Sequence, residues 1–252
     1  MINWDIFHDR GYVISDKIFR DEDIASLNVI ASKLNPSIGQ SKQGWYNYLR
    51  LHEERDQGVD ILNDIDWSYF WSHTPLDNPI INEKILPALS KICDQAFDGW
   101  DWGWQDTNRY IVQNYPHDES EAGIHPHFDA PYIWPQMLEK QMAKELQEGI
   151  LSVTFIVPLM NFTVETGATG VVPGTHKFIW DTTKWNDAKD YTTQFFKDNY
   201  VQPEVEMGRV ACFYGNILHS VMPNKSDMIR RGIIYRGIRQ DALDEMKKYE
   251  LG

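Results

Sequence analysis

Two side chains near the middle of the chain are of types that bind metal ions. His127 and Asp129 stand two positions apart in the stretch Gly-Ile-His-Pro-His-Phe-Asp-Ala-Pro-Tyr, which covers residues 123–132. On an extended strand, residues i and i+2 project from the same face, so the imidazole and the carboxylate point at one spot. Two ligands do not complete a site, and His219 is the best candidate for the third. Two histidines and one carboxylate on one face of a metal, with the other positions open, form the ligand set of non-haem Fe(II) oxygenases.

Glycine and proline residues frame the first pair. A His-x-Asp tripeptide by itself is a weak signal, since it occurs by chance in many chains. Here Gly123, Pro126 and Pro131 surround it, which indicates a strand end or a turn, where sites are commonly built. His125 is expected to be exposed or to lie behind the ligands, because Pro126 disturbs the strand geometry that would align it with His127.

A turn and an arginine follow the second histidine. After His219 come Pro-Asn-Lys-Ser at 223–226 and then Arg230, at the start of another apolar segment. An arginine that enters a strand next to a metal can hold a carboxylate through two parallel hydrogen bonds. The alternative is that Arg230 is an exposed charge at a strand start, and Arg231 is then the next candidate for this role.

The composition is that of an acidic protein long enough for one large, well-buried core. The chain has 252 residues, with 37 acidic and 24 basic side chains and a formal charge of -13, and β-rich chains of this length often form one domain. Such a chain is not expected to bind nucleic acid or an anionic membrane unaided. Cys93 and Cys212 offer no disulfide framework and are expected to be small buried residues.

Targeting and membrane signals are not recognised in the sequence. The start, Met-Ile-Asn-Trp-Asp, lacks a basic region followed by an apolar run, so no signal peptide is expected. The longest apolar run, 150–160, is too short to span a bilayer. We therefore expect a soluble, cytoplasmic protein without a membrane partner.

The first part of the chain, up to about residue 105, is predicted to be mainly helical. A turn at Gly11 should lead into a short strand, and Asp21 is placed to cap a helix that runs to about Leu34. Segment 80–97 has apolar residues near helical spacing, and Pro87 should kink or break that helix.

The pattern changes to strands after about residue 106. The segments that read as strands are 108–115, 149–159, 170–172, 204–214 and 232–237. Strands with long connections, preceded by helices, suit a mainly β protein with flanking helices, built as a double-sheet jelly roll whose mouth can hold a ligand. We predict one domain over residues 1–252, with the jelly-roll core at about 106–240. Segment 178–203 has no pattern that assigns it.

Several stretches form a specific combination, in order along the chain. They are Phe-His-Asp-Arg-Gly-Tyr-Val-Ile at 7–14, His127-Phe-Asp129, a hairpin at 165–177 that contains Pro-Gly-Thr-His, the strand at 208–219, and the spacing from His219 to Arg230. Together they resemble the phytanoyl-CoA dioxygenase family of Fe(II)- and 2-oxoglutarate-dependent oxygenases, over most of the chain.

The resemblance implies a double-stranded β-helix, the cupin-like jelly roll, with iron in its mouth. His127, Asp129 and His219 would bind Fe(II), and Arg230 would pair with the distal carboxylate of the co-substrate 2-oxoglutarate. O2 would be consumed, succinate and CO2 released, and a C–H bond of a small-molecule substrate hydroxylated. Asp129 favours hydroxylation or a related oxidation, because related halogenases lack this carboxylate.

Some positions depart from the family pattern or stay open. Ser220 follows the second histidine directly, where family members often have Gly-Ser, so the hydroxyl contact to 2-oxoglutarate does not carry over. One of Asn108, Tyr110 and Gln113, on the strand before the motif, is a candidate to hydrogen-bond this co-substrate. His176, after the Pro-Gly turn, is expected to be structural.

Two other functions compete with the oxygenase interpretation. One is a non-catalytic metal-binding jelly-roll protein, in which the three ligands hold Zn2+ or Ni2+ without turnover; intact Asp129 and Arg230 speak against it. The other is a nucleic-acid demethylase of the same chemistry, which the negative charge disfavours. No adenine-nucleotide signature is visible, so the family resemblance does not indicate a phytanoyl-CoA substrate.

Overall fold

A computed structural model describes most of the chain. The described residues are 2–33, 71–75, 78–105, 110–114, 126–128, 150–177 and 189–248. The predictions for Asp129, His125 and Asn108 fall outside them, and so does the unassigned segment 178–188.

The N-terminal segment forms a short helix and then a strand. Helix α1 (Trp4–Arg10) begins at Asn3, whose side chain accepts a hydrogen bond from the Ile6 amide at 3.1 Å. It ends at Gly11, which has a φ of 83°, a conformation that glycine adopts without steric cost. Strand β1 (Tyr12–Ile14) follows, as the predicted turn at Gly11 required, whereas α1 itself was not predicted.

The second helix differs from its prediction at its start. Helix α2 (Asp21–Ser32) has Arg20 at the N-cap, and no side chain caps it. Asp21 is therefore the first helical residue, where its charge favours the positive end of the helix dipole, and it is not the cap. Ile24 and Leu27 are buried, as their spacing predicted.

The third helical segment is continuous through its proline. A π-helical turn, η2 (Ile81–Ile85), leads into α5 (Leu86–Ala96), with Pro87 in the first turn of α5. The backbone stays helical from η2 into α5, so the π-helical turn just before Pro87 accommodates the proline within a continuous helix and there is no break. The apolar residues at helical spacing, Ile81, Ile85, Leu89 and Ile92, are all buried.

An antiparallel sheet forms the largest layer. In the described residues its order is β1-β7-β5-β9-β4-β2, and β3 also pairs with β9. The strands not yet given are β2 (Trp71–Pro75), β3 (Trp102–Trp104), β4 (Tyr110–Asn114), β5 (Ser152–Pro158), β7 (Ala211–Tyr214) and β9 (Arg230–Arg239). The N-terminal strand β1 thus completes an edge of the sheet whose other strands come mostly from the predicted jelly-roll core.

Two of the strands differ in length from their predictions. The segment 204–214 is not continuous, because the chain turns at Gly208, which has a φ of 86°. Only β7 joins the large sheet, while Val205 makes an isolated bridge with Phe162. The segment 232–237 extends in both directions and forms β9, whose two neighbours β4 and β5 hydrogen-bond to it along much of its length.

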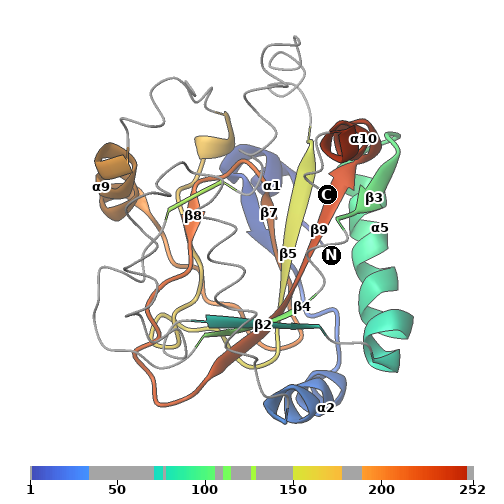
Figure 1. The fold of residues 1–252 in the computed structure, drawn as a ribbon, viewed down its shortest axis with the longest axis vertical. Coiled ribbons are helices and arrows are strands. Elements are labelled where there is room, and N and C mark those ends of the chain that lie inside the picture. Colours follow the sequence, from blue (N-terminus) through green and yellow to red (C-terminus); the bar gives the residue numbers. More distant parts are fainter. Residues whose placement is uncertain are drawn as a thin grey trace.

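A second, smaller layer faces the large sheet. It contains β6 (Gly170–Val171) and β8 (His219–Ser220), which pair with each other, and His127 and Val201 extend it through isolated bridges. The fold is a jelly roll with flanking helices, as predicted. Figure 1 shows β5 and β9 side by side, with α5 on one side of them and β8 and α9 (Lys189–Asn199) on the other.

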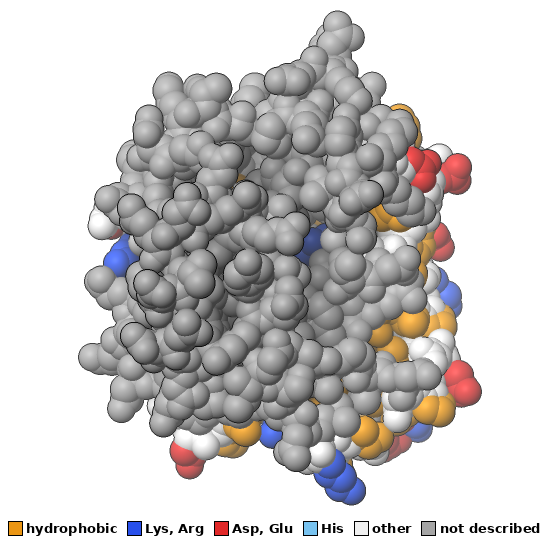
Figure 2. All heavy atoms as spheres, in the orientation of Figure 1, with side chains coloured by type: hydrophobic (Ala, Val, Ile, Leu, Met, Phe, Trp, Pro, Cys, Tyr) orange, Lys and Arg blue, Asp and Glu red, His pale blue; other side chains and the backbone are white. Residues whose placement is uncertain are grey.

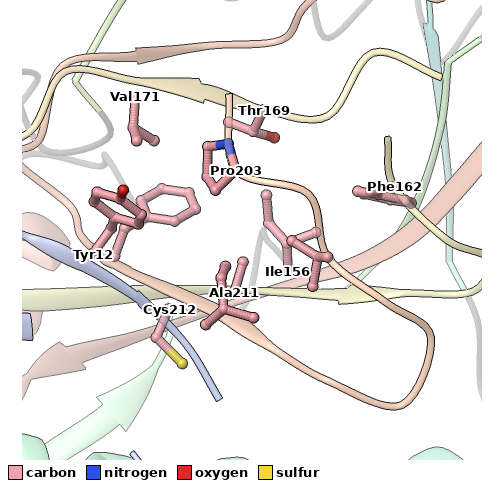
Figure 3. A pocket seen from close by; sticks show the side chains of 11 residues that line it. Tyr12, Ile156, Phe162, Thr169, Val171, Pro203, Ala211 and Cys212 are labelled. Atoms are coloured by element: carbon pink, nitrogen blue, oxygen red, sulfur yellow. The ribbon is translucent and has the colours of Figure 1, made fainter. Parts of the chain in front are cut away.

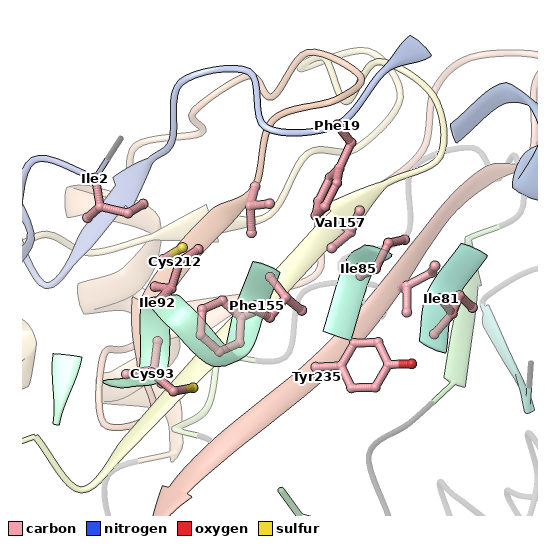
Figure 4. Close-up of a cluster of buried hydrophobic side chains, with 14 of the residues drawn as sticks. Ile2, Phe19, Ile81, Ile85, Ile92, Cys93, Phe155, Val157, Cys212 and Tyr235 are labelled. Carbon is pink, nitrogen blue, oxygen red and sulfur yellow. The ribbon is translucent and has the colours of Figure 1, made fainter. Parts of the chain in front are cut away.

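The core lies on both faces of the large sheet. One cluster joins α5 and η2 to the face of the sheet that carries Phe155, Val157 and Tyr235 (Figure 4). Cys93 and Cys212 are buried in this cluster, which confirms their prediction as apolar core residues. A second cluster fills the space between the two sheets, and a third packs α9 against the outer side of the small sheet.

The outer parts of the described chain show mixed charge. Figure 2 shows acidic, basic and apolar side chains interspersed along the margin of the face drawn there. Within the described ranges, none of the helices is both long enough and apolar enough to cross a membrane.

Candidate metal centre

Two histidines from distant parts of the sequence meet on the small sheet. His127 and His219 form an antiparallel bridge, with an N···O distance of 2.8 Å from the His127 amide to the His219 carbonyl and 3.0 Å in the reverse direction. Residues directly opposite each other on paired strands project to the same side. Their rings accordingly lie with centroids 4.3 Å apart. This is close enough for both imidazoles to bind one metal ion.

The ring of His219 is oriented by its own backbone. Its Nδ1 lies 3.0 Å from the carbonyl oxygen of Ile217. Because a carbonyl oxygen only accepts hydrogen bonds, Nδ1 carries the proton and Nε2 carries the lone pair. Metal-binding histidines commonly donate their second N–H in this way. Phe213, on β7 of the large sheet, packs against the same ring with centroids 4.9 Å apart.

The residues next to the two histidines point away from the metal side. Phe128 and Leu218 are buried in the cluster beneath α9, together with Phe196 of that helix. Alternation along a strand puts His127 and His219 on the opposite face, toward the large sheet. Helix α9 lies in the segment that sequence patterns did not assign, so its role behind the histidines was missed.

Asp129 is the one predicted ligand that lies outside the described residues. Within the described ranges, three or more His, Cys, Asp or Glu side chains nowhere come together in a way that could hold a metal ion. The other two predicted ligands, His127 and His219, lie together, and Asp129 follows two residues after His127. Its role stays a prediction from the His-x-Asp spacing.

Arg230 is buried between the two layers, at the start of β9. Its side chain is only 4% exposed, and its Nη1 donates a hydrogen bond to the carbonyl oxygen of Gly167. The guanidinium also lies 4.7 Å from the centre of the Phe162 ring. No carboxylate of the described residues pairs with it, and burial lowers the pKa of Arg230 to about 10. A buried, charged group of this kind calls for an anionic ligand.

The neighbouring arginine faces the other way. Arg231 donates from Nε to the side-chain oxygen of Gln113 at 3.0 Å, and these two residues are partners in the β4–β9 register. Asn114 is opposite Arg230 in the same register, and its side-chain amide donates to the Met222 carbonyl at 3.1 Å. Gln113, a candidate for co-substrate binding, therefore belongs to the face opposite Arg230.

A buried asparagine organises the turn between His219 and Arg230. The side-chain nitrogen Nδ2 of Asn224 donates to the carbonyl of Asn114 at 2.9 Å and to that of Met228 at 2.7 Å. Its oxygen accepts from the Ser226 amide at 3.1 Å and from the Ser226 hydroxyl at 2.7 Å. The side chain thus satisfies the polar groups of the turn and ties it to β4. The turn was predicted from its Pro-Asn-Lys-Ser sequence, but this internal bonding was not.

Gly167 presents the carbonyl that holds Arg230. It has a φ of 78°, and a Cβ atom there would lie 2.5 Å from the Met222 carbonyl oxygen and 2.7 Å from that of Pro223. Only glycine allows this close backbone approach. The contact between the loop at 163–168 and the turn after His219 therefore depends on the glycine of the Glu-Thr-Gly stretch.

The motifs and geometry agree with a family-level match. The model of the family "Phytanoyl-CoA dioxygenase (PhyH)" matches residues 7–232. The chain belongs to this family. A curated relative, dioxygenase aneA of Aspergillus aculeatus, is 28% identical over 183 residues, which cover 70% of this chain and 54% of the relative. The chain spans about half the length of the curated dioxygenases that match it over most of its length.

Solved structures share the fold of this phytanoyl-CoA dioxygenase family member. HygX from Streptomyces hygroscopicus, solved with nickel, 2-oxoglutarate and hygromycin B bound, superposes with a TM-score of 0.59 at 11% identity, covering 94% of this chain and 86% of HygX. The epimerase SnoN, solved with Fe3+, α-ketoglutarate and nogalamycin RO, gives a TM-score of 0.54 at 13% identity, covering 93% of this chain and 81% of SnoN. At these identities the likeness shows the fold.

His176, in the Pro-Gly-Thr-His stretch of the family hairpin, is structural. Its Nε2 lies 3.1 Å from the carbonyl of His8, and its ring stacks on Tyr214 with centroids 4.6 Å apart. The hydroxyl of Tyr214 in turn lies 2.8 Å from Nδ1 of His8. Burial lowers the pKa of His176 below its ordinary value. The motif therefore fastens α1 to the jelly roll, as its predicted structural role requires.

Proposed function

We propose that the chain is an Fe(II)- and 2-oxoglutarate-dependent oxygenase that hydroxylates a C–H bond of a small molecule, using O2 and releasing succinate and CO2. In this proposal, His127, Asp129 and His219 bind the iron. Arg230 binds the distal carboxylate of 2-oxoglutarate.

The observation that carries the proposal is the buried guanidinium of Arg230. Its described contacts are a backbone carbonyl and a phenyl ring, so its charge is not balanced by a described carboxylate. A dicarboxylate bound between the sheets would supply that charge. The guanidinium matches a carboxylate in shape and in its parallel N–H donors. Nε2 of His219, which carries the lone pair, would bind a metal at the other end of the same 2-oxoglutarate molecule.

Family membership and the related structures support this assignment. HygX holds nickel, 2-oxoglutarate and hygromycin B, and SnoN holds Fe3+, α-ketoglutarate and nogalamycin RO, so chains of this fold combine a metal, the keto acid and a small organic molecule. The matching fungal relatives are named dioxygenases. We propose a small-molecule substrate for this chain on the same basis.

Bound iron with 2-oxoglutarate would supply the oxidation of the C–H bond; the protein's own groups bind and orient. The Ile217 carbonyl holds the His219 ring in the tautomer that binds metal. Gly167 and Phe162 hold the Arg230 side chain in place. Phe213 covers one side of His219 with hydrocarbon and excludes water there.

Residues 1–252 are proposed to act as one domain. The N-terminal strand β1 pairs with β7, and α1 contacts the Pro-Gly-Thr-His segment through His176, so the N-terminal part packs as a piece of the jelly roll. The predictions of a cytoplasmic location and of no nucleic-acid partner stay predictions.

The proposal is tested by turnover in the absence of a known substrate. Oxygenases of this chemistry are expected to convert 2-oxoglutarate slowly to succinate even when uncoupled. Succinate is measured with Fe(II) and O2, then with Zn2+ in place of Fe(II), and with Arg230→Met. Succinate that requires Fe(II), O2 and Arg230 supports the proposal. Tight metal binding without succinate under any condition would favour the non-catalytic metal-binding protein.

A further inference from the structure

An apolar cavity of about 20 Å³ lies between the two sheets (Figure 3). Ile156 and Ala211 of the large sheet line it on one side, and Val171 of the small sheet and Pro203 line it on the other. A cavity of this size holds one water molecule or one small diatomic molecule, since about 10–15 Å³ is the minimum for one water. The cavity is therefore too small for a substrate and is the right size for a gas.

The lining of the cavity disfavours water. Most of its described lining residues are aliphatic or aromatic, and among these described residues Tyr12, Thr169 and Cys212 are the ones that carry a side-chain heteroatom. A buried water needs two to four polar partners, and apolar cavities stay dry. Dioxygen makes no such demand, because it is apolar and forms only weak hydrogen bonds.

The lining of the cavity includes half-buried residues as well as a buried residue, Phe213, that contacts the histidine pair. Tyr12, Thr169 and Pro203 are half-buried, whereas Phe213 and Val171 are buried. Phe213 lines the cavity and also contacts the His219 ring, with centroids 4.9 Å apart.

The aromatic wall nearer Arg230 is Phe162. Its ring lies under the Arg230 guanidinium and occupies the space left by Gly232, where a Cβ atom would come within 2.7 Å of it. The cavity is thus separated from the proposed iron site by Phe213 and from the proposed co-substrate site by Phe162.

We propose that this cavity is a binding site for dioxygen, through which O2 reaches the iron ligands without passing through the mouth that receives the organic substrate. The proposal rests on the oxygenase function proposed above. Separate access would be useful because the organic substrate and 2-oxoglutarate would both enter by the mouth of the jelly roll, whereas Phe213 is a hydrocarbon side chain that a rotamer change can move aside.

Xenon tests the cavity without any turnover. Xenon is an apolar probe that occupies gas-sized cavities, and crystals of the protein under xenon pressure should show it beside Ala211. The variant Ala211→Leu projects three more carbon atoms from a position that pairs with Ile14 and Ile156, so it should remove the xenon site. Xenon beside Ala211 that disappears in Ala211→Leu would support the proposal; no xenon in either protein, together with equal oxygen rates in the two, would overturn it.

Oxygen kinetics test the route. The anaerobic complex with Fe(II) and 2-oxoglutarate is mixed with O2 at several concentrations, and the loss of its visible charge-transfer band is followed. Ala211→Leu should slow the O2-dependent rate by at least roughly tenfold, within the range over which access changes association rates. Its affinity for 2-oxoglutarate should stay within roughly twofold of wild type, a difference of about 0.4 kcal/mol.

Matched variants separate the outcomes. Ala96→Leu adds the same side chain at a buried position on α5, away from the cavity, and should leave the oxygen rate unchanged. If Ala211→Leu does not fold, the same measurements are made with Val171→Ile, which adds one methylene to the cavity wall. An unchanged oxygen rate in a folded variant without bound xenon overturns the proposal. Weakened 2-oxoglutarate binding also overturns it, because the cavity would then be part of the co-substrate site. A missing charge-transfer band in wild type would instead refute the proposed function.

Discussion

At the scale of single residues, the two adjacent arginines of β9 show how register assigns a role. Arg230 faces the space between the sheets and is buried without a described carboxylate, whereas Arg231 faces the other side and bonds Gln113. The sequence left both as candidates. Alternation along the strand distinguishes their roles, because only every second side chain of β9 faces the histidine pair.

Arg230→Met should weaken 2-oxoglutarate binding strongly while iron binding is retained. Removing one partner of a buried ion pair costs about 3–5 kcal/mol, which corresponds to a dissociation constant raised by roughly two to four orders of magnitude. The protein without ligand should be at least as stable as wild type, because a buried charge without a described counter-ion has been removed. Calorimetric titration of 2-oxoglutarate and chemical unfolding measure the two effects.

Arg231→Met is the matched control for this change. It removes the same charge from the next position, so its affinity for 2-oxoglutarate should match that of wild type. Loss of 2-oxoglutarate binding in Arg231→Met, with normal binding in Arg230→Met, would show that the roles of the two arginines are reversed.

His176 should make the stability of the protein depend on pH. Burial lowers its pKa in the folded state, so the unfolded chain binds more protons between that lowered pKa and the ordinary value of 6.5. The free energy of unfolding should therefore fall as the pH drops below 6.5, and urea unfolding at pH 7.5 and 5.5 measures it. His176→Gln should show a smaller pH dependence than wild type. Equal pH dependence in wild type and in His176→Gln would exclude this role of His176.

At the scale of elements, the loop at 163–168 and the turn after His219 act as one support for Arg230. The Lys225 amide bonds the Glu165 carbonyl at 2.8 Å, and Gly167 lies against the carbonyls of Met222 and Pro223. The two connections are distant in sequence, yet they set the position of the same guanidinium.

Gly167→Ala should weaken 2-oxoglutarate binding as well as the fold. A left-handed residue costs about 1–2 kcal/mol when it carries a Cβ atom, and here that atom also meets two carbonyl oxygens. We expect a loss of more than about 2 kcal/mol of unfolding free energy and roughly a tenfold weaker affinity for 2-oxoglutarate, which is about 1.4 kcal/mol. Gly174→Ala is the control, since Gly174 has a φ of 81° with no atom near its Cβ position. It should lose stability only; an equal loss of affinity in both variants would contradict the support role.

Helix α9 should matter for iron binding although it carries no ligand. Phe196 is fully buried against Phe128 and Leu218, the residues next to the two histidines. Phe196→Ala should cost about 3–5 kcal/mol of stability and should weaken Fe(II) binding, because the paired strands lose their backing. Phe195→Ala removes a half-buried neighbour and should have a smaller effect on both. Iron affinity that is unchanged in folded Phe196→Ala would show that the pairing of the strands alone positions the histidines.

At the scale of the whole molecule, local patterns predicted the jelly roll and most of its strand segments but not its long-range supports. The His-x-Asp segment and the strand before His219 were predicted from their own residues, and the structure brings His127 and His219 together. The carbonyl of Gly167 that bonds Arg230 comes from a residue 63 positions away. No local pattern encodes such a contact, because it depends on how the two layers stack.

The other elements that the sequence patterns did not predict correctly were missed for similar physical reasons. Helix α1 is only seven residues long, so it gives little periodicity to detect. Helix α9 has a polar sequence in which buried Phe196 carries much of the packing, and its neighbours gave no clean amphipathic stripe. The predicted strand at 204–214 was too long because its apolar residues belong to two layers, joined by the turn at Gly208. In each case the tertiary structure decides what the local pattern leaves open.

The most direct test of the central claim is a spectroscopic titration without oxygen. Metal-free protein receives Fe(II) and then 2-oxoglutarate, and the visible metal-to-ligand charge-transfer band is recorded for wild type and for Asp129→Ala. The account predicts a band in wild type that needs both additions and saturates near one iron per chain, and a band in Asp129→Ala that is lost or needs far more iron. No band in folded wild-type protein, or identical titrations for the two proteins, would contradict the assignment of His127, Asp129 and His219 as the iron site.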